Sequence, residues 1–203
     1  MDGGNNVVVY VIDDDASVRK SLDRLMRAAG YQTETYSSAQ EFLSLDPPDR
    51  PGCMILDIKM PGITGLELQE RLASLNRRTP IIFITGHGSI PASVQAMKAG
   101  AVEFLEKPFD DKTLLDAISH AIEKDLQNRR KNDEMVTSRK RLKTLTPRER
   151  EVFDLVARGL LNKQAAYQLG VTEKTIKVHR AHIMAKLKVK SFADLVRLAE
   201  RLK

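Results

Sequence analysis

Residues 7–15 read VVVYVIDDD, an apolar run that ends abruptly in three aspartates. Apolar runs of similar length stand at 53–57, 80–84 and 102–106, and a weaker, edge-like run stands at 32–36. Short runs that are apolar at nearly every position are typical of strands buried on both faces of a parallel sheet. The opening run therefore predicts the first strand of a five-stranded parallel sheet.

Segments with helical periodicity separate these predicted strands. Apolar residues recur every three or four positions from Val18 to Ala29, and Gly30 follows them as a helix end. Two pairs with the spacing of a capping box mark further helix starts: Ser38 with Glu41, and Thr64 with Glu67. Because strands that alternate with helices fold as doubly wound sheets, residues 1–123 are predicted to form a flavodoxin-like α/β domain.

Polar side chains stand where these strands end. Asp13, Asp14 and Asp15 follow the first strand, Asp57 ends the third, Thr85 follows the fourth and Lys107 follows the fifth. The carboxyl ends of the strands share one edge of such a sheet, and ligands bind there. Carboxylates gathered at one edge repel one another unless they share a cation. Mg²⁺ bound directly by Asp14 and Asp57, and through water by Asp13, fits this requirement.

A carboxylate at this edge can also act as a nucleophile toward phosphorus and form an aspartyl phosphate. Such a transfer requires mainly positioning and charge neutralisation, for which Lys107 and Thr85 are the candidate lysine and hydroxyl. Taken singly, Asp15 is better interpreted as a helix N-cap, and Thr85 and Lys107 as a capping hydroxyl and a surface charge. Their joint position at the strand ends favours the functional interpretation.

The segments VYVIDDD, MILDIKMPGITGLE, IFITGHG and AVEFLEKPF resemble the signature segments of bacterial response-regulator receiver domains, from residue 7 to about residue 122. The resemblance implies that Asp57 is the phosphoacceptor, that Asp13 and Asp14 are the metal-site acids, and that the Lys59 carbonyl completes the metal shell. It also implies that Lys107 is the salt-bridging lysine and that Thr85 and Phe104 are the switch pair. In that family the bond that matches Lys107–Pro108 is cis, and the sequence leaves the isomer of this bond open. Phe104 stands where tyrosine is frequent, which excludes a hydrogen bond from that switch residue.

Charge divides the chain into three parts. Residues 1–122 hold 12 basic and 17 acidic residues, residues 123–143 hold 8 and 4, and residues 144–203 hold 13 and 6. A small basic domain has the electrostatic signature expected of nucleic-acid binding. Residues 124–143 lack Gly and Pro, so we expect a linker that is helical rather than a flexible coil. Thr146, Pro147 and Glu149 form a complete helix start, at which a separate all-α domain of residues 144–203 begins.

This basic domain is predicted to contain a helix-turn-helix. A short helix from about Lys163 to Leu169 is followed by a turn at Gly170 and a longer helix from Glu173 to about Lys186. One face of the longer helix is apolar, and the opposite face carries small and basic residues that suit a major groove. The candidate DNA contacts are Lys177 for guanine edges, Val178 and Ala181 for thymine methyl groups, Lys186, Lys188 and Lys190 for phosphates, and also Lys174 and Thr175.

Residues 145–191 closely resemble the LuxR-type DNA-binding domain, a four-helix helix-turn-helix domain. The whole chain is similar to FixJ/NarL-class response regulators, and the GHG, EKPF and VHRAHIMAKL segments lean toward the FixJ side. Ala181 occupies a site that some members fill with lysine. The resemblance implies a sensor histidine kinase, double-stranded DNA and RNA polymerase as partners, and homodimerisation on phosphorylation through residues 90–106. It implies no enzymatic activity beyond phosphorylation and dephosphorylation of the protein's own aspartate.

Two alternatives are weighed against this regulator. A phosphatase-like enzyme with a basic tail would use the acidic edge alone, and a phosphorylation-independent DNA-binding protein would use the helix-turn-helix alone. Neither accounts for both features. One cysteine, no signal-peptide pattern and no apolar run near the roughly 18 residues of a membrane span indicate a cytoplasmic protein without a membrane partner.

Overall fold

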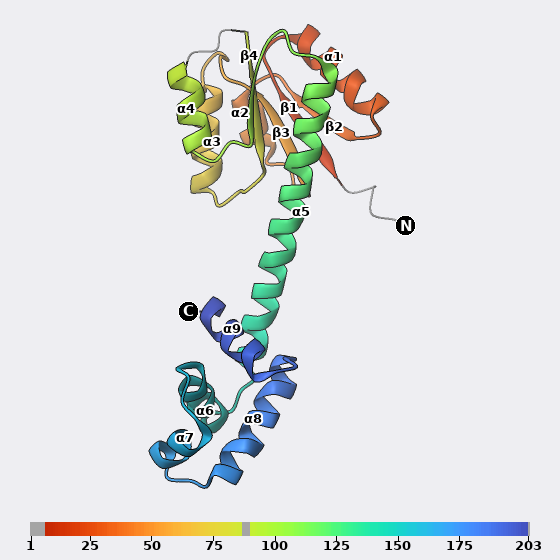
Figure 1. The fold of residues 1–203 in the computed structure, drawn as a ribbon. Coiled ribbons are helices and arrows are strands. Elements are labelled where there is room, and N and C mark those ends of the chain that lie inside the picture. The colour runs from red at the N-terminus through yellow and green to blue at the C-terminus, as the bar shows by residue number, and fades with distance from the viewer. Residues whose placement is uncertain (1–6, 87–89, 203) are drawn as a thin grey trace. The chain divides into compact units, whose positions relative to one another are not determined.

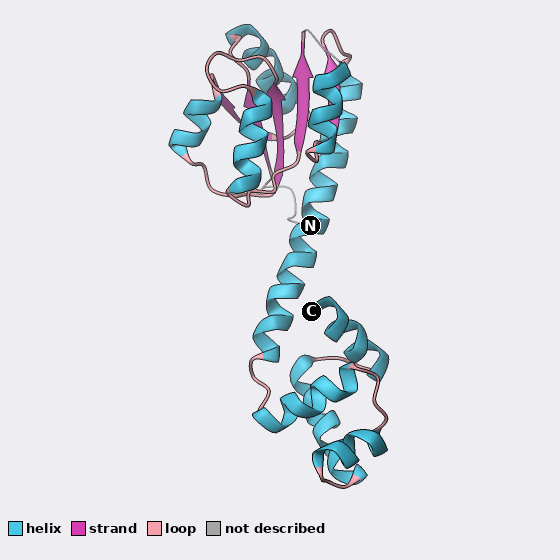
Figure 2. Ribbon diagram, turned by 90° about the vertical axis from the view of Figure 1, so that its left-hand side faces the viewer, coloured by secondary structure: helices cyan, strands magenta, loops and turns pink. Residues whose placement is uncertain are grey.

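The computed structural model describes residues 7–86 and 90–202 and divides the chain into two compact units, residues 1–129 and residues 130–203. The boundary between the units falls within one helix, α5 (Asp111–Leu142). Strands occur in the first unit, whereas the described part of the second unit is helical (Figure 2). Within the described ranges no helix is long and apolar enough to cross a membrane.

Five parallel strands in the order β2-β1-β3-β4-β5 form the sheet of the first unit (Figure 1). The strands are β1 (Val8–Ile12), β2 (Gln32–Tyr36), β3 (Gly52–Asp57), β4 (Ile81–Thr85) and β5 (Glu103–Glu106). The helices between them are α1 (Ala16–Ala28), α2 (Ala39–Leu45), α3 (Gly65–Ser74) and α4 (Ile90–Lys98), and α5 follows the last strand. This strand order is that of flavodoxin-like sheets, so the predicted doubly wound fold is confirmed.

The alternation of side chains along each strand builds a core on both faces of the sheet. Val8, Tyr10 and Ile12 of β1 point to one face and pack with residues of α2, α3 and α4. Val9 and Val11 point to the other face and pack with residues of α1 and α5. All five residues of β1 are buried, as expected of a central strand of a parallel sheet.

Short-range capping decides where the helices begin. Asp15 is the N-cap of α1, and its side chain accepts a hydrogen bond from the Ser17 N–H at 2.7 Å. Ser38 caps α2, and Thr64 forms a complete capping box with Glu67 at the start of α3. The helix starts inferred from sequence are therefore present, whereas His87 and Gly88 of the predicted GHG segment lie outside the described residues.

Four helices follow α5 in the second unit: α6 (Pro147–Ala157), α7 (Asn162–Leu169), α8 (Glu173–Leu187) and α9 (Phe192–Leu202). Val152, Phe153, Ile176, Ile183 and Leu195 are among the buried residues that form their common core. Gly170 ends α7 in the left-handed conformation at φ 65°, which produces the tight turn before α8. The predicted helix-turn-helix is confirmed.

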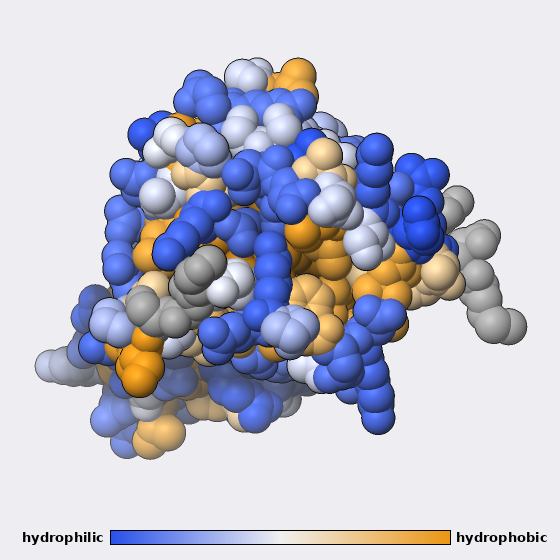
Figure 3. Space-filling view, turned by 90° about the horizontal axis from the view of Figure 1, so that it is seen from above, coloured by the Kyte–Doolittle hydropathy of each residue, from blue (hydrophilic) through white to orange (hydrophobic). Residues whose placement is uncertain are grey.

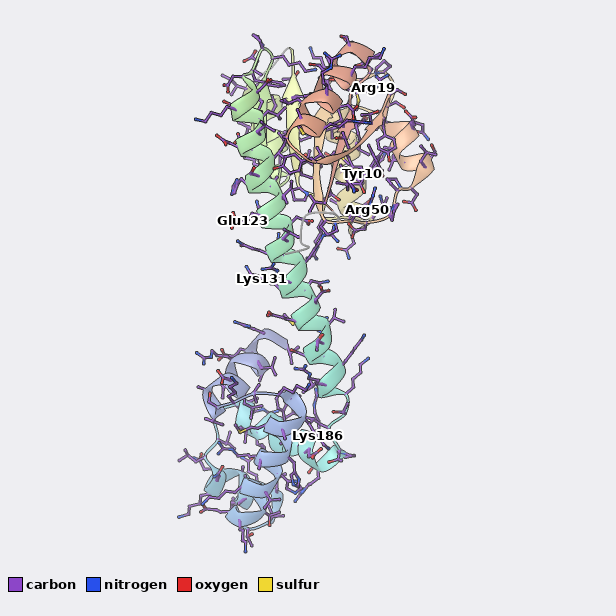
Figure 4. All side chains as sticks on the ribbon, turned by 90° about the vertical axis from the view of Figure 1, so that its right-hand side faces the viewer. Tyr10, Arg19, Arg50, Glu123, Lys131 and Lys186 are labelled. Carbon is purple, nitrogen blue, oxygen red and sulfur yellow. The ribbon has the colours of Figure 1, made fainter. Side chains whose placement is uncertain are left out.

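An ion pair between a buried carboxylate and a partly exposed lysine fixes the start of α6 to α8. The Glu149 carboxylate, in a capping box with Thr146, accepts a hydrogen bond from the Lys186 ammonium at 2.6 Å (Lys186 is labelled in Figure 4). Glu149 is 4% exposed. The hydrogen bond from Lys186, followed by that from the Thr146 N–H, lowers the pKa of Glu149 from 4.5 to about 2.

This depressed pKa makes the stability of the second unit pH-dependent. A carboxylate whose pKa is lower in the folded state contributes stability above its unfolded pKa and loses it as pH falls through the folded pKa. We expect Glu149→Gln to lower the unfolding temperature near neutral pH, with the difference from wild type closing between pH 4.5 and about 2. Thermal unfolding of the full chain across this pH range measures the difference, with the partly exposed neighbour Glu151→Gln as control. A difference that stays constant down to pH 2 would contradict this role of Glu149.

Candidate functional site

The ends of β1 and β3 bring two aspartates together at one edge of the sheet. Ile12 pairs with Leu56 in the parallel register, so Asp13 and Asp57 occupy equivalent positions on neighbouring strands. This edge lies where strand order reverses, the position at which doubly wound sheets bind ligands. Figure 3 looks onto this side of the first unit and shows mostly hydrophilic residues, with apolar residues visible between them.

Lys107 joins the two aspartates from the end of β5. Its Nζ atom lies 2.8 Å from Asp13 Oδ2 and 3.1 Å from Asp57 Oδ1. The two carboxyl residues are buried, with exposures of 1% for Asp13 and 6% for Asp57. The single positive charge of Lys107 is therefore shared between two buried carboxylates, which lowers the cost of burying these like charges together.

Backbone groups hold the remaining carboxylate oxygens. The Asp15 N–H donates to Asp13 Oδ1, and the Lys59 N–H donates to Asp57 Oδ2, each at 2.8 Å. The Arg19 guanidinium of α1 (labelled in Figure 4) donates to the Asp13 carbonyl at 2.6 Å. Both carboxylates are thus oriented before any ligand arrives.

Charge and burial set the titration of this cluster. Burial raises the pKa of Asp57, while the hydrogen bond and charge of Lys107 oppose the shift, and the pKa stays above its ordinary value. Burial lowers the pKa of Lys107, but its hydrogen bonds to Asp13 and Asp57 outweigh that effect and raise the pKa overall. Lys107 therefore remains an ammonium ion beside Asp57 at neutral pH.

The other predicted residues of this edge are placed differently. Asp14 is exposed beside Asp13, and within residues 7–86 and 90–202 no group of three or more His, Cys, Asp or Glu side chains is arranged to hold a metal ion. Thr85 is 1% exposed at the end of β4, and its carbonyl accepts the Lys107 N–H at 2.8 Å. Phe104 of β5 is half-buried and packs against the core face that α2, α3 and α4 cover. The Lys107–Pro108 bond is cis.

Gly65 is a residue of this site that the sequence reasoning missed. A Cβ atom at this position would lie 2.3 Å from the carbonyl oxygen of Asp57. The Gly65 N–H also donates to the Ile58 carbonyl at 3.0 Å, so the start of α3 rests on the backbone of the aspartate. The glycine between the predicted cap Thr64 and the helix that follows was the available signal in the sequence.

We expect Gly65→Ala to displace the Asp57 backbone, because a Cβ at 2.3 Å from a backbone oxygen forces a shift. Overpacking of this kind costs roughly 1–3 kcal/mol of unfolding free energy. Denaturant unfolding measures this cost. Gly62→Ala is the comparison, because a Cβ at Gly62 would meet no atom within 4 Å. The φ of 79° at Gly62 means that this variant has backbone strain but no steric clash. Wild-type stability in Gly65→Ala would show that the Asp57 backbone makes room for the added Cβ without cost.

In the second unit, α8 presents the predicted base-contacting residues to solvent. Lys174, Lys177, Val178 and Ala181 are all exposed, and they lie opposite the buried Ile176 and Ile183. Thr175 is half-buried, and its hydroxyl lies 2.9 Å from that of the N-cap residue Thr172. The predicted base-contacting face is therefore solvent-exposed, and Thr175 contributes to the start of the helix.

The predicted phosphate-binding lysines differ in their surroundings. Lys186 is engaged with Glu149, although 37% of its side chain is exposed. Lys188 is the C-cap of α8 in the left-handed conformation, with φ 54°, and it is exposed. Lys190 is also exposed. The three lysines stand at alternate positions around the end of α8. A phosphate contact by each of them stays a prediction.

Comparison with known proteins agrees with both halves of this description. Residues 9–119 match the response regulator receiver domain, and residues 143–199 match the bacterial regulatory proteins of the luxR family. The chain is 46% identical to Nodulation protein W of Bradyrhizobium diazoefficiens, over 99% of this chain and 88% of that protein. It is 44% identical to the transcriptional regulatory protein FixJ of Rhizobium meliloti, over 94% of each chain.

Two solved structures are similar to this chain over nearly its whole length. The low-resolution structure of response regulator StyR has a TM-score of 0.82 and 47% identity, and covers 97% of this chain and 99% of that one. Full-length FixJ from B. japonicum has a TM-score of 0.60 and 40% identity, with 98% and 97% covered. The name transcriptional regulatory protein FixJ and the two family descriptions are those of regulators rather than of classical enzymes. The chain therefore belongs to the response regulators that join a receiver domain to a LuxR-type DNA-binding domain.

Proposed function

We propose that Asp57 accepts a phosphoryl group from a sensor histidine kinase, and that this phosphorylation controls sequence-specific DNA binding by the second unit. The observation that carries the proposal is the pair of buried carboxylates, Asp13 and Asp57, joined by Lys107. The proposed domains are a receiver over residues 1–123, a linker over residues 124–143 and a DNA-binding domain over residues 144–203.

The donor set fits Mg²⁺. Carboxylate and carbonyl oxygens are the ligands that this ion prefers, and Lys107 shows that the edge accommodates positive charge between Asp13 and Asp57. The proposed ligands are Asp14 and Asp57 directly, Asp13 through water, and the Lys59 carbonyl. Bound there, Mg²⁺ would neutralise charge on the phosphoryl oxygens.

The protein's own groups supply the remaining chemistry. The hydrogen bond from the Lys59 N–H orients Asp57 so that its other oxygen, now beside Lys107, is the candidate nucleophile. The Lys107 ammonium is placed to stabilise the new phosphoryl charge, and Thr85 supplies a hydroxyl at the neighbouring strand end. The proposed activity is limited to phosphorylation and dephosphorylation of this one aspartate.

Homodimerisation on phosphorylation is supported by the surface of α4. Ile90, Val94 and Met97 are 82%, 44% and 45% exposed, and they follow one another at helical spacing. Such a stripe favours a protein contact, and it lies within the predicted face of residues 90–106. Rearrangement of Thr85 and Phe104 on phosphorylation would reach this face, because Phe104 lies on β5 beside it.

The proposed role at promoters implies that RNA polymerase is a partner and that the protein acts in the cytoplasm. Relatives carry the names transcriptional regulatory protein FixJ and response regulator protein TodT. A chain that binds chromosomal DNA to control transcription acts in the compartment that holds the chromosome.

The DNA contacts of α8 predict two different binding defects. A duplex selected from a random library by the full chain, in the presence of Mg²⁺ and a small phosphodonor, serves as the specific probe. Lys177→Ala is expected to lower the preference for this duplex over a shuffled one by roughly 1–3 kcal/mol, because it removes a base contact. Lys188→Ala is expected to weaken both duplexes alike and to flatten the salt dependence. An identical, sequence-independent loss in both variants would contradict the assignment.

The test of the proposed function is the affinity for the selected duplex with and without phosphodonor, for wild type and Asp57→Asn. We expect phosphorylation to raise the affinity of the wild type only. Equal affinities in both states of the wild type would favour a phosphorylation-independent DNA-binding protein. Repeated turnover of a phosphomonoester would favour the phosphatase-like alternative.

A further inference from the structure

Arg180 connects three helices of the second unit from the middle of α8. Its Nη1 donates to Asn162 Oδ1 at 2.6 Å, and its guanidinium carbon lies 4.4 Å from the centroid of the Phe192 ring. Asn162 is the first residue of α7, and Phe192 is the first residue of α9. One half-buried side chain thus holds the starts of both neighbouring helices to α8.

The position of Arg180 on α8 places it beside the proposed reading face. It follows the buried Ile176 by four residues and precedes the buried Ile183 by three, so it lies at the border of the core. It also follows the exposed Lys177 by three residues and directly precedes Ala181. Arg180 therefore lies between the buried face of α8 and its exposed face.

We propose that Arg180 is a positioning residue for DNA recognition, which sets the rotation and height of α8 relative to α7 and α9. The inference rests on the proposed function of α8 in the major groove. A helix-turn-helix reads bases only when its second helix enters the groove in register with the contacts that its neighbours make to the backbone. Base contacts tolerate displacements of well under an ångström, whereas nonspecific phosphate contacts tolerate more.

The chemistry of this connection is specific to arginine. The guanidinium carbon lies over the Phe192 ring while Nη1 donates to Asn162, and a lysine has only one nitrogen to place at these two positions. Neither partner is acidic, so the contacts are made through shape and hydrogen bonding rather than through an ion pair. Arg180→Lys therefore keeps the charge of the domain and removes the positioning.

The experiment measures full-chain affinity, with Mg²⁺ and a small phosphodonor present, for the duplex selected by the wild type and for a shuffled duplex. We expect Arg180→Ala and Arg180→Lys to weaken the selected duplex about tenfold and the shuffled duplex less than about twofold. Arg197→Ala is the control, since it removes one exposed positive charge from α9. Thermal unfolding of each variant ensures that binding is measured on folded protein.

The partner residues distinguish positioning from direct DNA contact. Phe192→Leu and Asn162→Ala are expected to reproduce part of the specificity loss, and adding Arg180→Ala to Phe192→Leu should cost less than the sum of the single losses. The salt dependence of binding should stay that of the wild type, because no phosphate contact is lost. Additive losses with a reduced salt slope would instead make Arg180 a phosphate contact and overturn the proposal.

Two further results are decisive. A wild-type ratio of selected to shuffled affinity in Arg180→Ala and Arg180→Lys would overturn this inference alone and leave the proposed function in place. Failure of the wild type to select any duplex would overturn the proposed function, and the inference with it.

Discussion

Lys107→Ala is expected to destabilise the receiver by about 3 kcal/mol, because removal of one partner from a buried ion pair leaves uncompensated charge. Here two carboxylates lose their cation at once, since Lys107 Nζ lies 2.8 Å from Asp13 and 3.1 Å from Asp57. The lysine side chain is 24% exposed, so solvent screens part of the effect. The loss still exceeds that expected for a surface ion pair.

Denaturant unfolding of the full chain, followed in the receiver transition, measures this loss. Lys112→Ala on α5 is the matched control, because Lys112 is exposed and should leave stability unchanged. Added Mg²⁺ is expected to restore part of the stability of Lys107→Ala by supplying positive charge to the same carboxylates. Wild-type stability in Lys107→Ala without Mg²⁺ would show that the two aspartates do not depend on the lysine.

Arg129→Ala is expected to destabilise the receiver by a similar amount, about 3 kcal/mol. Asp125 is 2% exposed and accepts hydrogen bonds from Arg129 Nε at 2.7 Å and from the Gly52 N–H at 3.0 Å. Arg129 also donates to the Arg50 carbonyl at 3.0 Å and pairs with Asp49. Its removal leaves a buried carboxylate with a single backbone donor at the start of β3.

The neighbouring Arg130→Ala serves as control, because Arg130 is exposed. Asp125→Asn in the Arg129→Ala background removes the unpaired charge and should recover part of the lost unfolding free energy. If Arg129→Ala and Arg130→Ala unfold at the same denaturant concentration, the pair does not stabilise the receiver. A loss in Arg129→Ala that Asp125→Asn does not reduce would show that the unpaired carboxylate is not its cause.

Local features of the sequence predicted most of the fold. The predicted strands agree with all five observed strands to within one residue at each end. Burial on both faces leaves few polar positions in β1, β3 and β4, whereas β2 was identified only as a weaker edge strand. Capping is equally local, so Ser38, Thr64 and Thr146 identified their helices directly. The carboxyl-edge residues Asp13, Asp57 and Lys107 were brought together because a parallel sheet aligns its strand ends.

Side-chain partners that are distant in sequence were not predicted. Periodicity indicates which face of a helix is buried, but it does not say which residue of another helix lies opposite. Lys186 was therefore interpreted only as a phosphate contact, whereas its ammonium binds Glu149, 37 residues away. Asp125 and Arg129 lie in the expected linker, and their contacts with Gly52 and Asp49 were not predicted from the sequence. Arg180 had no assigned role for the same reason.

The most direct test of the account is the intact mass of the full chain after incubation with a small phosphodonor. Wild type, Asp57→Asn and the exposed-site control Asp116→Asn are compared with and without Mg²⁺. We expect one phosphoryl group on wild type and Asp116→Asn, only with Mg²⁺, and none on Asp57→Asn. A phosphoryl group that persists on Asp57→Asn, or its absence from the wild type, would contradict it.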